Sequence, residues 1–213
     1  MSAPRWDVSE QGTSGWLRAR CGCLTASRMA DAVAYLKGGK EAEARRKLKI
    51  ELLTERLTDM AVERYVNEAM RWGIETEPEA KERYEEITGR LIQPCGFALH
   101  GDIEFFGASP DGLLSVDGLI EIKCPTSTTH MQWLLDGVVP DQHKPQMLAQ
   151  MAVTGRQWCD FMSYDPRFAD GKAIFIRRFE PTSEEIKAVE DAARLFLSEV
   201  DQMFESIIYQ EAA

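Results

Sequence analysis

The spacing of apolar positions changes along the chain and marks out two kinds of element. In the first 90 or so residues, and again near the end, apolar side chains recur every three or four positions, which is typical of amphipathic helices. Thr25 or Ser27 is suited to cap one of these helices, and the Gly38-Gly39 pair to end it. The pattern predicts helices over residues 16–20, 25–36, 41–57, 62–72, 78–88, 127–135, 144–153 and 183–208.

The middle of the chain shows shorter apolar runs that are typical of strands. They predict strands at residues 91–92, 96–100, 103–106, 113–116, 119–124, 158–164 and 173–179. Asp117-Gly118 stands between two of these runs, and this dipeptide is a strong hairpin signal. We therefore expect the strands on either side of it to pair as an antiparallel hairpin.

The order of these elements predicts the fold class. Helices, antiparallel strands, a helical stretch, further strands and a last helix indicate an α/β fold of the α+β type, with a mixed central sheet of about five strands flanked by helices. No internal repeat, low-complexity tract or Gly/Ser linker interrupts the chain. We expect residues 1–213 to form a single domain.

The composition is consistent with one folded domain and limits the cellular compartments in which the protein is expected. The 213 residues are 44% hydrophobic and 28% charged, which is enough to bury a sizeable core. No apolar run approaches the ~20 residues that cross a bilayer, and no charged-then-apolar leader opens the chain. Five cysteines without a CxxC pair suggest neither a zinc site nor a disulfide framework. These features predict a cytoplasmic protein with no membrane partner.

The net charge of -10 argues against a polyanionic partner when it is taken as a whole. The charge is segregated, however, because residues 1–56 hold 11 basic and 7 acidic side chains while the rest of the chain is strongly acidic. Such a chain can bind DNA with one surface, although a charge run is more often a solvated helix face. The basic residues gather at Lys37, Lys40, Arg45, Arg46, Lys47 and Lys49.

Candidate chemistry lies on the predicted hairpin. Asp111 precedes its first strand, and Glu121 and Lys123 lie in its second. Alternate residues of a strand share a face, so Glu121 and Lys123 point the same way and Ile122 points into the core. If the hairpin pairs as expected, Asp111 comes close to Glu121, and two carboxylates meet one amine.

Hydrolysis of a phosphodiester needs this set of groups. Carboxylates hold Mg²⁺ and leave sites for water and phosphate, the Ile122 carbonyl can join them, and a nearby lysine can orient the water. The same E-x-K pattern at residues 79–81 and 185–187 lies in helical segments, where it has no such partner. The other interpretation is that Asp111 is a turn residue and that Glu121 and Lys123 form a solvated strand pair.

Pro110-Asp111 followed by Glu121-Ile122-Lys123 resembles the PD-(D/E)xK nuclease signature. With the surrounding segments, the chain resembles the lambda-exonuclease family of phage recombination exonucleases. The resemblance implies a restriction-endonuclease-like core. The segments that carry it are Trp16 to Arg20, Thr25 to Ser27, Trp72-Gly73 with Glu77, Ser109 to Leu113, Glu121 to Pro125, Gln146, and Tyr164 to Arg167.

The resemblance also implies roles for matching residues. Asp111, Glu121 and the Ile122 carbonyl would hold the catalytic metal, Glu77 would help bind a second ion or the water, and Lys123 would activate the water. The terminal 5′-phosphate would be bound by Arg20, Ser27, Ser109 and Gln146. DNA would be contacted by the basic segment with Lys37, Lys40, Arg45 and Arg46. The chain departs from the family at residues 126–129, where four Ser and Thr residues replace a region with an arginine.

The activity implied by the resemblance is a Mg²⁺-dependent 5′-to-3′ exonuclease with one or two ions, for which Mn²⁺ can substitute. Its substrate would be linear double-stranded DNA, and its product a 3′ single strand for a single-strand annealing recombinase. Relatives form a ring-shaped homotrimer, encoded by a phage or prophage in a bacterial host. Two alternatives remain open: an endonuclease or junction resolvase with the same core, and a non-catalytic interaction protein.

Overall fold

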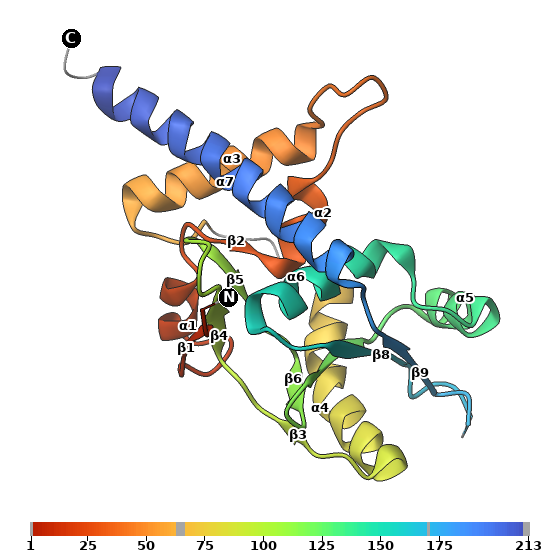
Figure 1. Ribbon diagram of the computed structural model, residues 1–213. Helices are drawn as coiled ribbons and strands as arrows, with labels where there is room; N and C mark the ends of the chain where they lie inside the picture. Colours follow the sequence, from red (N-terminus) through yellow and green to blue (C-terminus); the bar gives the residue numbers. More distant parts are fainter. Residues whose placement is uncertain (1, 63–66, 170, 211–213) are drawn as a thin grey trace.

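The computed structural model describes residues 2–62, 67–169 and 171–210 and contains two mixed sheets flanked by helices (Figure 1). The helices are α1 (Ser14–Ala19), α2 (Met29–Ala32), α3 (Glu43–Thr58), α4 (Glu68–Thr88), α5 (Ser127–Asp136), α6 (Lys144–Thr154) and α7 (Ser183–Gln210), with 3-10 turns η1 (Ala26–Arg28) and η2 (Asp141–His143). The strands are β1 (Arg5–Asp7), β2 (Leu24–Thr25), β3 (Ile92–Gln93), β4 (Phe97–Leu99), β5 (Phe106–Ala108), β6 (Gly112–Leu114), β7 (Gly118–Lys123), β8 (Trp158–Tyr164) and β9 (Ile174–Phe179). The predicted mixed α/β class is confirmed.

The larger sheet has the strand order β3-β6-β7-β8-β9. Its centre is the predicted hairpin, in which β6 and β7 run antiparallel, while β7 and β8 run parallel. Gly112 lies opposite Ile120, so Asp111, one residue earlier, comes level with Glu121. The prediction that the hairpin brings these two carboxylates together is confirmed.

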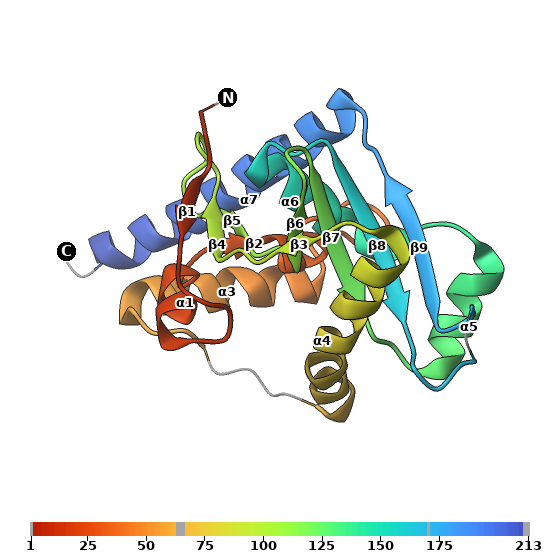
Figure 2. The same cartoon turned by 90° about the horizontal axis from the view of Figure 1, so that it is seen from below.

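Helices cover both faces of this sheet (Figure 2). On one face, Ala80 and Tyr84 of α4 pack against Ile120 and Ile122 of β7 in a buried cluster. The other face packs against α5 and α6. Its buried cluster contains Leu119, Phe161, Trp133, Met147 and Met151. Since alternate residues of β7 enter the two clusters, Glu121 is directed to the α6 face.

The smaller sheet, with the order β1-β4-β5-β2, lies beside a helical layer of α2, α3, α6 and α7. Leu48 and Leu52 of α3 and Phe196 and Val200 of α7 are buried together there. The long α7 crosses α3 and extends beyond the body of the molecule (Figure 1). None of the helices in the described part of the chain is long and apolar enough to span a bilayer.

One predicted helix differs from the structure in residues 25–42. The helix expected over 25–36 is only η1 and α2, because the chain reverses at Gly38 and Gly39, both with positive φ. Across this turn, the Leu36 N–H donates to the Lys40 carbonyl at 2.8 Å instead of to a helical acceptor. The loop, residues 34–42, projects between α2 and α3 (Figure 1).

The two helices expected over 62–72 and 78–88 are one helix, α4, which contains Pro78. Asn67 caps its start by accepting a hydrogen bond from the Met70 N–H at 2.9 Å. A proline inside a helix removes one backbone hydrogen bond, but Pro78 lies on the exposed side while Thr76, Ala80 and Tyr84 are buried against the sheet. The stabilisation gained by packing this face against the sheet outweighs the lost hydrogen bond, so the helix continues through Pro78. Residues 63–66 of the earlier prediction lie outside the described residues.

Among the strands, the prediction missed β1 and β2 and placed one strand too early. Residues 103–106 were expected to be extended, whereas β5 begins at Phe106 after a turn in which Phe105 has φ of 57°. The missed strands are only two or three residues long, so they carry almost no periodic signal.

Candidate active site

The hairpin brings three charged groups to one site. The Asp111 carboxylate accepts a hydrogen bond from the backbone N–H of Ile122, with Oδ2 2.6 Å from the nitrogen. Lys123 Nζ forms an ion pair with Glu121 Oε1. The residues predicted to carry the chemistry, Asp111, Glu121 and Lys123, are therefore brought together at the end of β7.

Burial makes it unfavourable for the carboxylates of this cluster to carry negative charge. Glu121 is fully buried, and burial together with the Glu121 charge raises the pKa of Asp111 well above its usual range. Although burial alone would lower the pKa of Lys123, the charges of Glu121 and Asp111 raise it. Two carboxylates that repel each other at a buried site are stabilised by positive charge, which Lys123 provides in part.

Two glutamines of α6 donate to the buried carboxylate of Glu121. Gln146 Nε2 lies 2.7 Å from Glu121 Oε1, and Gln150 Nε2 lies 2.6 Å from Oε2. They are four residues apart and so share one face of the helix. Gln146 was predicted to bind phosphate, and it lies within the cluster. Gln150 was not singled out, and its only signal in the sequence was this spacing.

Glu77 lies on α4, where it forms an ion pair with Lys81 at 2.7 Å. Its negative charge is near enough to contribute to the raised pKa of Asp111. Within residues 2–62, 67–169 and 171–210, no three His, Cys, Asp or Glu side chains are grouped as a metal site.

Three of the side chains predicted to bind the terminal phosphate, those of Arg20, Ser27 and Ser109, lie around α1, η1 and β5. Trp16 Nε1 donates to Ser109 Oγ at 2.8 Å, and the Arg20 guanidinium stacks 3.9 Å from the centre of the Trp16 ring. Ser109 follows β5 and precedes Pro110-Asp111, so this group adjoins the carboxylates. Ser27 lies in η1, after β2, which pairs with β5. Trp16 is half-buried and links Arg20 to Ser109.

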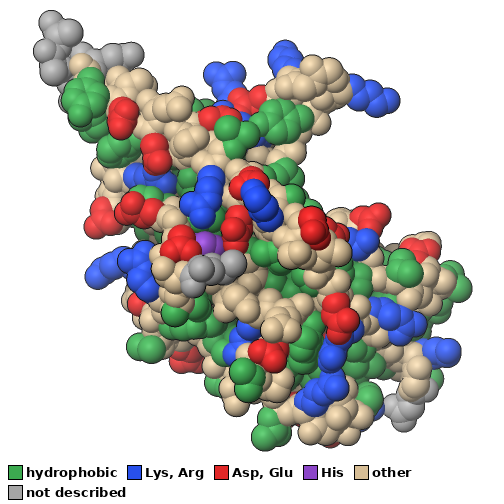
Figure 3. All heavy atoms as spheres, in the orientation of Figure 1, with side chains coloured by type: hydrophobic (Ala, Val, Ile, Leu, Met, Phe, Trp, Pro, Cys, Tyr) green, Lys and Arg blue, Asp and Glu red, His purple; other side chains and the backbone are tan. Residues whose placement is uncertain are grey.

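The basic segment divides into exposed and buried residues. Lys37 and Lys40 are exposed on the projecting loop, and Arg46 is exposed on α3. On the face drawn in Figure 3, basic side chains lie on this loop, and elsewhere on that face basic and acidic side chains are mixed. These residues are accessible to a polyanion.

Arg45 is a correction to the predicted DNA contacts. Its side chain is only 3% exposed, and its guanidinium forms ion pairs with Glu41 and Glu199 and donates to the Ala32 carbonyl at 2.8 Å. Its donors are directed into the packing between α3 and α7, so it serves the fold. The sequence could not reveal this, because Glu199 is 154 residues away.

Two histidines near the sheet hydrogen-bond or pack within the fold. Both ring nitrogens of His130 have partners, Ser163 Oγ at 2.7 Å and the Lys172 carbonyl at 2.8 Å. His143 stacks on Phe161, and burial together with the Lys123 charge lowers its pKa to about 4. At neutral pH its ring is therefore uncharged and packs against Trp133 and Phe161.

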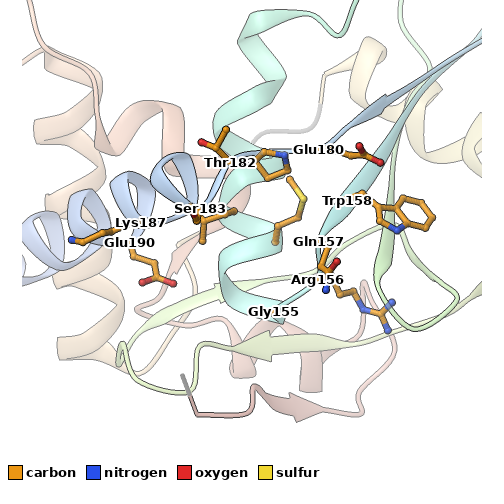
Figure 4. Close-up of a pocket in the computed structure, with 12 residues that line it drawn as sticks. Gly155, Arg156, Gln157, Trp158, Glu180, Thr182, Ser183, Lys187 and Glu190 are labelled. Atoms are coloured by element: carbon orange, nitrogen blue, oxygen red, sulfur yellow. The ribbon is translucent and has the colours of Figure 1, made fainter.

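A cavity of about 640 Å³ lies between the end of α6 and the beginning of α7 (Figure 4). Its walls include Arg156, Trp158, Thr182 and Lys187. Asp111, Glu121 and Lys123 do not line it. Arg156 is occupied there by backbone carbonyls, including that of Gly118 at 2.7 Å. The cavity is thus separate from the charged cluster.

The fold and the cluster together define a class: a nuclease with a PD-(D/E)xK core. Comparison with protein families matches residues 15–157 to the YqaJ-like viral recombinase domain. The chain belongs to this family, which is related to lambda exonuclease, and it is an exonuclease of the hydrolase class. Comparison with curated proteins gives no match.

Solved structures agree with this assignment. The chain is 40% identical to LHK-Exo, an alkaline exonuclease from Laribacter hongkongensis, over 94% of this chain and 98% of that one, with a TM-score of 0.86. A second structure of LHK-Exo, in complex with dAMP, gives 40% identity over the same shares of the two chains and a TM-score of 0.87. A phage-related exonuclease from Haemophilus somnus is 14% identical over 87% of this chain and 96% of that one, with a TM-score of 0.63, and shows the fold alone.

Proposed function

We propose that this exonuclease uses Mg²⁺ to digest one strand of linear duplex DNA from a 5′-phosphorylated end, leaving a 3′ single-stranded overhang. The observation that carries the proposal is the meeting of Asp111, Glu121 and Lys123 on the hairpin, next to Arg20 and Ser109. A DNA substrate is supported by the relative from Laribacter hongkongensis, an alkaline exonuclease with a structure in complex with dAMP.

The donor set fits a divalent cation. Exonucleases of this kind generally depend on a metal. Burial together with the charge of Glu121 raises the pKa of Asp111, and a cation would offset that negative charge. Asp111, Glu121 and the Ile122 carbonyl would hold the ion, and Glu77 would serve a second ion or its water. These are hard oxygen donors, which suit Mg²⁺ and also Mn²⁺. When bound, the ion lowers the pKa of the attacking water and neutralises charge on the phosphate.

Side chains of the protein orient the attacking water and bind the terminal phosphate. Lys123 is an ammonium fixed beside Glu121, where it orients the attacking water and stabilises charge on the phosphoryl oxygens. Arg20 offers a planar fork that matches phosphate oxygens, and the hydroxyls of Ser27 and Ser109 donate to the same group. Binding the terminal phosphate places the first internucleotide bond at the carboxylates, so cleavage proceeds from the 5′ end.

The assembly belongs to the same proposal and is drawn from the family resemblance. Three copies form a ring around the duplex, and the surviving 3′ strand passes to a single-strand annealing recombinase in the bacterial host of a phage or prophage. The mass of the protein in solution tests the trimer. A monomer at working concentrations would contradict this part while leaving the chemistry unaffected.

The central experiment is digestion of a linear duplex labelled at the 5′ or the 3′ end, with Mg²⁺ or with EDTA. We expect Mg²⁺-dependent release of the 5′ label as a mononucleotide, while closed circular DNA stays intact. Lys123→Ala should slow release at least ~100-fold, the scale of a lost catalytic group. Lys187→Ala is the matched control, since Glu185-Ile186-Lys187 repeats the pattern on α7. Equal cutting of closed circles would instead indicate an endonuclease.

A further inference from the structure

Gln150 is a buried polar side chain for which the reaction described above has no use. It lies on α6, is 1% exposed, and donates from Nε2 to Oε2 of the fully buried Glu121 at 2.6 Å. The orientation of its amide follows from chemistry, because a carboxylate oxygen accepts a hydrogen bond and would repel the amide oxygen. The Gln150 amide nitrogen therefore binds one atom, Oε2 of Glu121.

The other end of the amide, Gln150 Oε1, is buried and has no hydrogen-bond partner among residues 2–62, 67–169 and 171–210. An unsatisfied buried acceptor is unfavourable, and an apolar side chain of similar volume would avoid it. The neighbours of Gln150 on α6, Ala149, Met151 and Ala152, are apolar and buried, so polarity at this position needs a reason other than packing.

The two oxygens of Glu121 have different surroundings. Oε2 faces Gln150 in the interior, whereas Oε1 faces Lys123 and the half-buried Gln146. Lys123 and Gln146 are partly exposed, so the Oε1 side of Glu121 borders the solvent. Gln150 is enclosed, so the Oε2 side does not. Only Oε1 is thus available to a ligand from the side of Asp111 and Lys123.

We propose that Gln150 is a positioning residue that binds Oε2 of Glu121 and presents Oε1 alone to the catalytic cation. The inference rests on the proposed function, because it takes Asp111 and Glu121 as the metal ligands. It assigns Gln150 and Gln146, one turn apart on the same helix, to opposite oxygens with opposite effects on the ion. Gln150 supports the ligand, while Gln146 competes with the metal for Oε1.

The test is calorimetric titration of Mg²⁺ into the full-length protein. Gln150→Met keeps the length of the side chain and removes the donor, and we expect it to weaken Mg²⁺ binding about tenfold, as loss of a partner to a metal ligand typically does. Gln146→Met is the matched contrast on the same helix, and it should leave Mg²⁺ affinity unchanged or increase it. Digestion by Gln150→Met should recover toward the wild-type rate at saturating Mg²⁺.

Thermal unfolding establishes that each variant is folded, and Gln150→Leu replaces Gln150→Met if the latter is not. Equal Mg²⁺ affinity in wild type and the Gln150 variant would overturn the inference, as would equal weakening by the Gln146 variant. A wild-type chain that binds Mg²⁺ but does not digest linear DNA would refute the proposed function. The calorimetric comparison would still decide the role of Gln150.

Discussion

At the scale of single residues, Arg20 is the group most directly tied to the choice of DNA end. Its guanidinium stacks on Trp16, which in turn donates to Ser109 beside the carboxylates. Arg20→Ala removes the fork for the terminal phosphate, so we expect digestion of 5′-phosphorylated ends to slow about tenfold to 100-fold, as a lost charge-assisted hydrogen bond of about 1.5–3 kcal/mol predicts. Digestion rates on 5′-phosphoryl and 5′-hydroxyl duplexes measure this effect.

The control for this prediction is Arg18→Ala, which removes an exposed arginine of α1, the helix that Arg20 caps. It should change both rates little. If Arg20→Ala slowed phosphorylated and unphosphorylated ends to the same extent, Arg20 would be a general DNA contact or a support for Trp16, and end recognition would lie elsewhere.

The central residues of the site could be predicted because their geometry depends on local sequence. Strand alternation sets Glu121 and Lys123 on one face, and the Asp117-Gly118 turn brings Asp111 level with Glu121. Gln150 and Arg45 could not be assigned in this way. Their partners, Glu121 and Glu199, are 29 and 154 residues away, and the contacts exist only after α6 and α7 pack onto the core.

At the scale of elements, the junction of α3 and α7 depends on one carboxylate. Glu199 accepts both arms of the Arg45 guanidinium, at 2.7 and 3.0 Å, and also pairs with Lys49 at 3.0 Å. The Arg45 hydrogen bonds lower the pKa of Glu199 despite its partial burial. Glu199→Gln leaves two buried cations with less compensation, so we expect a loss of about 2 kcal/mol in the free energy of unfolding at neutral pH.

The sign of the pH dependence follows from the lowered pKa. The stabilisation by Glu199 is complete above its unfolded-state pKa of 4.5 and is lost as pH falls through the lower folded-state value. Urea unfolding of wild type and variant should therefore differ at neutral pH and converge in acid. Glu205→Gln, at an exposed position of α7, is the control. A constant difference across this range would contradict the assignment.

Helices and strands with a regular spacing of apolar residues could be predicted from the sequence. Those that depend on contacts with distant parts of the chain could not. The pattern located β8, α6 and α7 to within two residues, because each carries a long amphipathic or buried run. It divided α4 at Pro78, since the local cost of proline is visible in the sequence and the packing of Tyr84 against the sheet is not. The second sheet needed contacts between distant short strands.

At the scale of the whole molecule, an acidic protein must bind a polyanion through a limited basic surface. Arg45 and Lys49 are neutralised by Glu41 and Glu199, so they add little to that surface. Lys37 and Lys40 remain exposed on the loop that extends from the body between α2 and α3 (Figure 1). We therefore expect this loop to supply phosphate contacts away from the active site.

Salt dependence measures those contacts directly. Each lysine that neutralises a phosphate of duplex DNA contributes about 0.9 to the slope of log K against log salt concentration. The double variant Lys37→Ala and Lys40→Ala should therefore lower that slope by about 2 in binding to linear duplex in EDTA. It should raise KM for DNA far more than it lowers kcat, because the carboxylates are untouched. Lys187→Ala on α7 should leave the slope unchanged, and an unchanged slope in the double variant would place the DNA path on another surface.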